Sequence, residues 1–227
     1  MTGTEAEILL LSVKVAFFAI LVALGPAFAV AWLLARRNFR GKAFLQAVVT
    51  LPLVLPPVVT GYGLLVLFGT QGALGHTMET LFGLTFAFRW TGAALAAGVM
   101  AFPLLVRPIR LSLEAVDRGL EEAAGTLGAS RLIAFFTVTL PLALPGVIAG
   151  AVLGFAKALG EFGATITFVS NIPGETQTLS LAIYALLQSP TGNEAAFRLI
   201  VIAILLALGA VLVSEWVARR LVRGERA

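Results

Sequence analysis

A lysine and a glutamate stand one helical turn apart in an otherwise apolar run. Lys157 and Glu161 are four residues apart, so their side chains share one face of a helix and can form an ion pair. A charge at membrane depth is costly and faces a partner or water. This leaves two interpretations. The one we favour is a mutual ion pair that locks the helix end; the other is a lysine that helps an anion past a gate.

Groups that catalyse reactions or hold metals are scarce. His76 is the only histidine, and the absence of cysteine excludes a thiolate metal site. The chain has no HExxH, no GxSxG and no phosphate-binding P-loop, and no carboxylates pair on one helix face within an apolar run. We therefore expect no catalysis by this chain, no metal and no cofactor.

A polar interruption between two apolar runs has the most informative spacing. Apolar residues recur at helical intervals between Ser112 and Leu127, with acidic and basic residues among them. This periodicity predicts a short amphipathic helix. Such a helix either docks in a groove of a partner protein or is an ordinary interfacial helix between two spans.

The ends of this helix also have sequence signals. Glycine tolerates the left-handed conformation, so Gly125 or Gly128 would end the helix. Ser130 can then cap the helix that follows, because its hydroxyl accepts a hydrogen bond from a free backbone N–H.

Proline and glycine interrupt the second apolar run. Pro52, Pro56 and Pro57 are followed by Gly61 and Gly63. Proline lacks an N–H and clashes with the preceding turn, so it kinks or breaks a helix. Broken helices at mid-membrane depth line a cavity or gate in many transporters, although a plain packing kink is the alternative. We predict that Pro56, Pro57 and Gly61 contribute to a pore wall.

Three glycines repeat at intervals of four in the fourth apolar run. Gly146, Gly150 and Gly154 form a face of small residues that lets a second helix approach closely. We interpret this face as helix packing. The partner helix belongs either to this chain or to a second copy.

The composition places these segments in a membrane. The chain is 59% hydrophobic and only 12% charged, with a mean hydropathy of +0.98. A bilayer core about 30 Å thick needs roughly 20 apolar residues per helix. We predict an all-α polytopic membrane protein with one transmembrane domain over residues 8–217. Its predicted spans are residues 8–35, 43–69, 91–111, 138–159 and 197–217, with a polar loop over 112–137.

Basic residues give the orientation. Twelve of the sixteen flank apolar runs in three clusters, which is the positive-inside pattern and argues against nucleic-acid binding. The three clusters must share the cytoplasmic side, so an odd number of spans puts the N-terminus outside. The clusters are Arg36, Arg37, Arg40 and Lys42; Arg107, Arg110, Arg118 and Arg131; and Arg219, Arg220, Arg223 and Arg226.

One stretch fits no full span. Residues 162–189 are moderately apolar but are broken by Asn171, Pro173 and Gly174. They form either a re-entrant pair of half-helices or an external cap. Backbone N–H and C=O groups at membrane depth must form hydrogen bonds within a helix or be buried in protein. We therefore expect the stretch to fold back against the bundle.

The polar segment resembles the EAA loop of the permease subunits of bacterial ABC importers. The family pattern is Glu-Ala-Ala, three residues, Gly, nine residues and then Ile-x-Leu-Pro. Here Glu122-Ala123-Ala124, Gly128 and Val138-Thr139-Leu140-Pro141 keep every spacing, with Val138 in place of Ile. The resemblance implies the type I transmembrane domain in the cell membrane, with a coupling helix that receives force from a separate ATPase. It also implies the residues that carry this coupling, which we take to be Glu121, Glu122, Ala123, Ala124 and Gly128.

Further stretches resemble the molybdate group of these permeases. They are Leu51–Gly61, with the sequence LPLVLPPVVTG; Gly160–Thr165, with GEFGAT; and Asn171–Leu179, with NIPGETQTL. The resemblance implies a homodimer in membrane lipid, two ATP-binding subunits and an extracytoplasmic oxyanion-binding protein. A sulfate or tungstate permease is the alternative in the same class. A stand-alone channel, a secondary transporter or an intramembrane enzyme is the alternative from another class.

Overall fold

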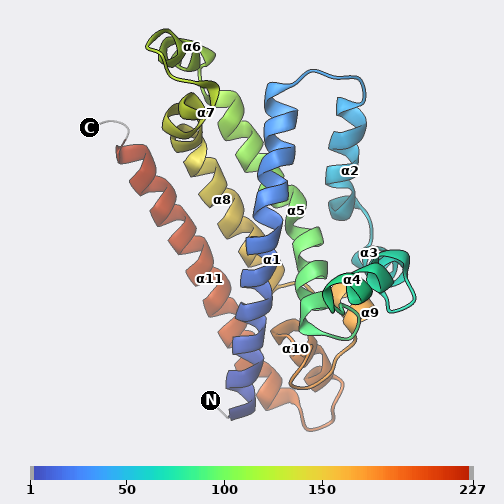
Figure 1. The fold of residues 1–227 in the computed structure, drawn as a ribbon. Helices are drawn as coiled ribbons and strands as arrows, with labels where there is room; N and C mark the ends of the chain where they lie inside the picture. The colour runs from blue at the N-terminus through green and yellow to red at the C-terminus, as the bar shows by residue number, and fades with distance from the viewer. Residues whose placement is uncertain (1–2, 225–227) are drawn as a thin grey trace.

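The computed structural model describes the backbone of residues 3–224 and the side chains of residues 3–213. Within that part the chain is helical and has no strand (Figure 1). The third basic cluster, at residues 219–226, lies outside the described side chains. The elements are α1 (Gly3–Arg36), α2 (Lys42–Val54), α3 (Pro57–Phe68), α4 (Ala73–Phe82), α5 (Trp90–Ala115), α6 (Arg118–Thr126), α7 (Arg131–Ala134), the π-helix η1 (Phe135–Thr139), α8 (Leu140–Leu159), α9 (Gly163–Val169), α10 (Leu179–Leu187) and α11 (Asn193–Gly224).

Four helical segments are long and apolar enough to cross a membrane. They are α1, α5, the continuous run from α7 through α8, and α11 as far as Val213. The bent pair α2–α3 makes a fifth if it is counted as one span, which agrees with the predicted number. At 34 residues α1 is about 51 Å long, so it is tilted or protrudes from the roughly 30 Å hydrocarbon core.

The second predicted span is broken. We expected one run over residues 43–69, whereas α2 and α3 meet at an angle of 112°. Leu55 and Pro56 between them have extended backbone, and Pro57 starts α3. Proline is tolerated there because the first helical N–H has no intrahelical partner to lose. The prolines therefore divide the span at the place that the sequence indicates, and they turn α3 away from the axis of α2.

Helix α5 is the centre of the bundle. Two thirds (67%) of its apolar window is buried, compared with 11% for α11. Small residues let α1 and α8 come close to it. A Cβ added at Gly98 of α5 would lie 3.2 Å from the Ala19 carbonyl oxygen of α1, and one at Gly150 of α8 would lie 3.0 Å from the Leu105 carbonyl oxygen.

The glycine face of α8 has its partner in this chain. A Cβ added at Gly146 would lie 2.6 Å from the Pro108 carbonyl oxygen and would also meet the side chain of Ser112. One at Gly154 would meet Ile20 of α1 and Leu105 of α5. These contacts answer the question that the sequence left open, because each neighbour lies on α1 or α5.

Residues 162–189 form two short helices at the end of the bundle opposite α6 (Figure 1). Helix α9 packs on α3 and α5, and α10 packs on α11. The Ser12 hydroxyl of α1 accepts a hydrogen bond from the buried Leu179 N–H, 2.7 Å away, at the start of α10. With seven and nine residues, neither helix can cross a bilayer, and both fold back against the bundle as expected.

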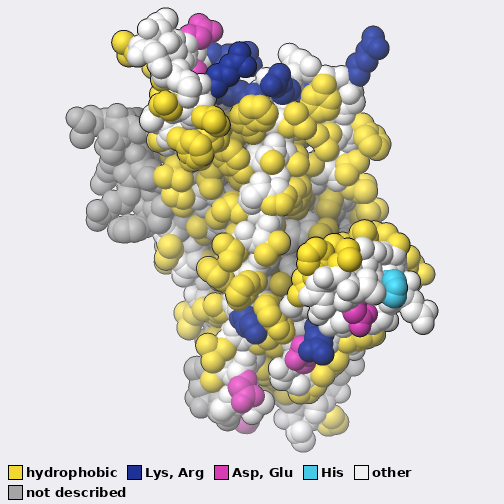
Figure 2. All heavy atoms as spheres, in the orientation of Figure 1, with side chains coloured by type: hydrophobic (Ala, Val, Ile, Leu, Met, Phe, Trp, Pro, Cys, Tyr) yellow, Lys and Arg dark blue, Asp and Glu magenta, His cyan; other side chains and the backbone are white. Residues whose placement is uncertain are grey.

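The charged side chains are segregated along the bundle. Figure 2 shows Lys and Arg side chains gathered at the end that carries α6, while isolated ones lie toward the other end. Apolar side chains cover the surface between the two ends. This distribution fits a multi-pass membrane protein whose α6 end faces the cytoplasm.

We predict that Gly146→Ala lowers the stability of the protein by roughly 1–3 kcal/mol, because its methyl group would overpack the α5–α8 contact. Gly25→Ala is the matched control, since Gly25 is also helical and no atom lies within 4 Å of an added Cβ. The unfolding temperatures of the two purified variants in detergent measure their stability. Unfolding of Gly146→Ala at or above the temperature of the unaltered protein would contradict the packing role.

Candidate functional site

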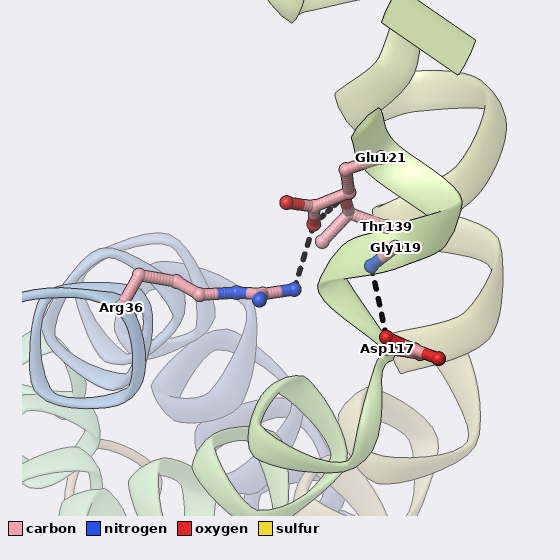
Figure 3. A network of polar contacts seen from close by, with 5 residues as sticks. All are labelled: Arg36, Asp117, Gly119, Glu121 and Thr139. Carbon is pink, nitrogen blue, oxygen red and sulfur yellow. Dashed lines mark hydrogen bonds and ion pairs between the residues drawn. The ribbon is translucent and has the colours of Figure 1, made fainter. Parts of the chain in front are cut away.

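Helix α6 is separated from α5 by a short extended break. We expected one helix from Ser112 to Leu127, and the structure corrects this: α5 ends at Ala115 and α6 begins at Arg118. The Asp117 carboxylate accepts a hydrogen bond from the Gly119 N–H, 2.8 Å away (Figure 3). Because an aspartate cap satisfies a free N–H of a new helix, Asp117 favours a restart over continuation of α5.

The other end of α6 closes as a Schellman motif. Gly128 has φ +90°, which glycine adopts without the penalty of a side chain. The Ala129 N–H donates to the Ala124 carbonyl and the Gly128 N–H to the Gly125 carbonyl, each at 3.0 Å. Gly128, rather than Gly125, therefore ends the helix. Ser130 caps α7 as predicted, with its hydroxyl accepting from the Ile133 N–H at 3.3 Å.

The outer surface of α6 is open. None of its residues is buried, and Glu122 and Ala123 are exposed while Ala124 is half-buried. Two leucines add apolar area: Leu120 on the helix and Leu127 at its end, the latter 89% exposed. An exposed carboxylate beside exposed leucines is a surface suited to a protein partner.

Glu121 points the other way and joins α6 to two further elements. Its Oε1 accepts from Arg36 Nη2 of α1 at 2.7 Å and from Thr139 Oγ1 of η1 at 2.5 Å (Figure 3). The side chains of Arg36 and Glu121 are only 11% and 31% exposed, and Thr139 is buried. We call these three residues the Glu121 junction.

Sequence reasoning missed two members of this junction. Arg36 was counted in a basic cluster, and Thr139 was noted only as part of the loop motif. Arg36 is 85 residues from Glu121, so no helical spacing rule connects them. The sequence held only weak signals for this contact. Arg36 lies at the end of one predicted span, and Thr139 lies at the start of another on the same side of the membrane.

The broken span meets α9 through its small residues. Pro56 and Pro57 are exposed at the break, whereas Gly61 is buried. A Cβ added at Gly61 would lie 2.9 Å from the Ala164 Cα, and one at Gly163 would lie 2.7 Å from the Pro57 Cβ. The two prolines are thus exposed beside α9, while Gly61 packs against it. A pore role for these residues stays a prediction.

Lys157 and Glu161 form the ion pair that we favoured. Lys157 Nζ lies 2.6 Å from Glu161 Oε2, and the Glu161 side chain is almost wholly buried. Its other oxygen accepts from the Ala164 N–H at 3.0 Å, which ties the end of α8 to the start of α9. The same carboxylate therefore neutralises Lys157 and positions the helix that packs under the broken span.

Metal-binding geometry is not found in the described part of the chain. No group of three or more His, Cys, Asp or Glu residues there could hold a metal ion. His76 lies exposed on α4, a helix at the edge of the bundle that the sequence analysis did not predict.

Comparisons with known proteins agree on one family. Residues 27–224 match the family model described as the binding-protein-dependent transport system inner membrane component. The Molybdenum transport system permease protein ModB of Escherichia coli K12 is 58% identical over 219 residues, which is 96% of each chain. The protein of the same name from Haemophilus influenzae is 57% identical over 217 residues, covering 96% of this chain and 95% of that one.

A solved structure shares the fold. The crystal structure of a bacterial ABC transporter involved in the import of alginate superposes with a TM-score of 0.74 over 97% of this chain and 80% of the other. The sequences are only 15% identical, so this likeness concerns the fold alone.

The end of α6 generates a prediction. Gly128→Ala should destabilise the last turn of α6 by roughly 1–2 kcal/mol, because a side chain is strained at φ +90°. Hydrogen exchange of the α6 amides should then become faster. Gly125→Ala is the control, since its Cβ would meet no atom within 4 Å and alanine favours helix. Equal exchange rates in the two variants would contradict the assignment of Gly128 as the helix end.

Proposed function

Because the chain belongs to the family of binding-protein-dependent transport system inner membrane components, we propose that it forms the transmembrane pathway for molybdate in an ATP-driven importer. The observation that carries the proposal is its high identity, over nearly the whole length, to molybdenum transport permeases. The proposed transmembrane domain covers residues 8–217. Since the chain contains no P-loop, ATP is hydrolysed by a separate nucleotide-binding subunit.

Helix α6 is the proposed contact with that ATPase. Its exposed residues Glu122, Leu120 and Leu127 support this, because they form a protruding surface at the basic end of the molecule (Figures 1 and 2). A short helix that lays an exposed face into a groove is a common recognition mode. Ala123 and Ala124 have short side chains, so the partner can approach the backbone of α6.

The assembly that we propose contains two copies of this chain, two ATP-binding subunits and an extracytoplasmic oxyanion-binding protein. The broken span is the face on which we propose that two copies pair, and its residues Val54, Phe44 and Tyr62 on α2 and α3 are 78%, 74% and 62% exposed. Exposed apolar patches of this kind mark interaction surfaces or lipid contacts. Pro56 and Pro57 would then lie beside the pathway between the two copies.

Transport follows from a two-state movement. ATP binding draws the ATPase subunits together. Each ATPase subunit then moves the α6 helix of the permease copy that it contacts. The helices attached to α6 then rock as rigid bodies, which alternately opens the pathway to the outside and to the cytoplasm. The oxyanion enters from the binding protein in the first state and leaves in the second.

Uptake of radiolabelled molybdate tests this function. Cells that lack their own molybdate permease should take up molybdate when they express this chain with its ATPase and binding protein. Tungstate, which has nearly the same size and charge, should compete with it, and excess sulfate should not. A disabled ATPase is the control and should abolish uptake.

The other outcomes point to different functions. Competition by sulfate would make the chain a sulfate permease. Uptake that persists with a disabled ATPase would make it a channel or a secondary transporter.

Charge reversal on the exposed face of α6 tests the ATPase contact. We expect Glu122→Arg to reduce co-purification of the ATPase by about tenfold or more, because like charges brought together across an interface cost several kcal/mol. Glu79→Arg is the control, since Glu79 is also exposed but lies on α4, away from α6 (Figure 1). Equal co-purification of both variants would remove α6 from the interface.

A further inference from the structure

Helix α6 has few ways to transmit movement to the spans. None of its residues is buried, so packing alone holds it loosely. The break at Val116–Asp117 also separates it from α5, and a bend of this kind absorbs displacement. Besides its contacts with α7 and η1, a side chain that holds α6 to neighbouring helices would carry a push on α6 to them directly.

Glu121 is such a side chain. One oxygen, Oε1, accepts from both Arg36 and Thr139, so a single carboxylate joins three elements. Arg36 is the last residue of α1, and Thr139 is the last residue of η1, directly before α8. Both α1 and α8 pack against the central helix α5. The junction thus connects α6 to two of the helices that make up the bundle core.

Burial gives these contacts their strength. Ion pairs exposed to water contribute little, because water and salt screen them. The Arg36 side chain is 11% exposed, Glu121 is 31% exposed and Thr139 is buried, so this ion pair is screened less than one on the open surface. Loss of one partner would leave a charge or a hydroxyl without its bond in a sheltered place.

The element that holds Thr139 is irregular. η1 is a five-residue π-helix between α7 and α8, and such segments occur often at functional sites. The hydroxyl bond to Glu121 therefore lies at the irregular turn through which α7 continues into α8.

We propose that Glu121 is a positioning residue that makes α1 and α8 follow the movement of α6, through Arg36 and Thr139. The two adjacent glutamates have different surroundings: Glu122 is exposed on the outer face of α6, while Glu121 bonds to the spans. The proposal rests on the function proposed above. It concerns how tightly uptake is linked to ATP hydrolysis, rather than whether the ATPase binds.

The test is molybdate uptake per ATP hydrolysed in the complete importer, reconstituted in lipid vesicles. We expect Arg36→Gln, Glu121→Gln and Thr139→Val each to lower this ratio roughly three- to thirtyfold, the range expected for residues that carry coupling between sites. The ATPase should still co-purify, and ATP should still be hydrolysed. Glu114→Gln is the control, since Glu114 forms an ion pair within α5, with Arg110 at 2.7 Å, and the ratio for this variant should not change.

A charge exchange separates coupling from simple damage. The double variant Arg36→Glu with Glu121→Arg restores the ion pair in reverse and should regain part of the lost ratio. Unchanged ratios in the Arg36→Gln and Thr139→Val variants, with an intact complex, would overturn the proposal. Lack of ATP-dependent uptake in the unaltered importer would instead refute the proposed function and can be recognised before any variant is measured.

Discussion

The close packing of α1 and α8 on α5 is the constraint on which the rest of the structure depends. Glycines at these contacts bring the backbones so near that an added methyl group would overlap a carbonyl oxygen, as at Gly146 and Pro108. In lipid there is little hydrophobic force between helices, so such close contact supplies much of their association. Because such packing leaves little free space, separating these helices would be costly.

The polar contacts lie at the two ends of this apolar body. At the basic end, Glu121 joins α6 to α1 and η1. At the other end, Glu161 joins Lys157 to the start of α9, which packs beneath the broken span. Both carboxylates are sheltered and each bonds two partners, so each fixes a junction that packing alone would leave loose. The permease thus combines a rigid middle with a polar joint at each end.

Local patterns in the sequence predicted local structure well. The apolar runs, the proline break, the Ser130 cap and the Lys157–Glu161 pair all depend on residues within one or two turns of each other. The restart of α6 at Asp117 was missed because apolar periodicity continued across it. The bond from Arg36 to Glu121 could not be predicted, because it depends on which helices become neighbours, and a single sequence does not reveal this.

We propose that α6 is the element through which this permease is driven, and cross-linking tests this role most directly. The chain has no cysteine, so an introduced one is unique. A cysteine-reactive cross-linker of short reach on Leu127→Cys should join the permease to its ATPase in intact membranes, with a yield that changes when ATP is bound. Leu81→Cys on α4, where Leu81 is also well exposed at 69%, should give no such product. Equal yields from both positions, or none from Leu127→Cys, would contradict the account.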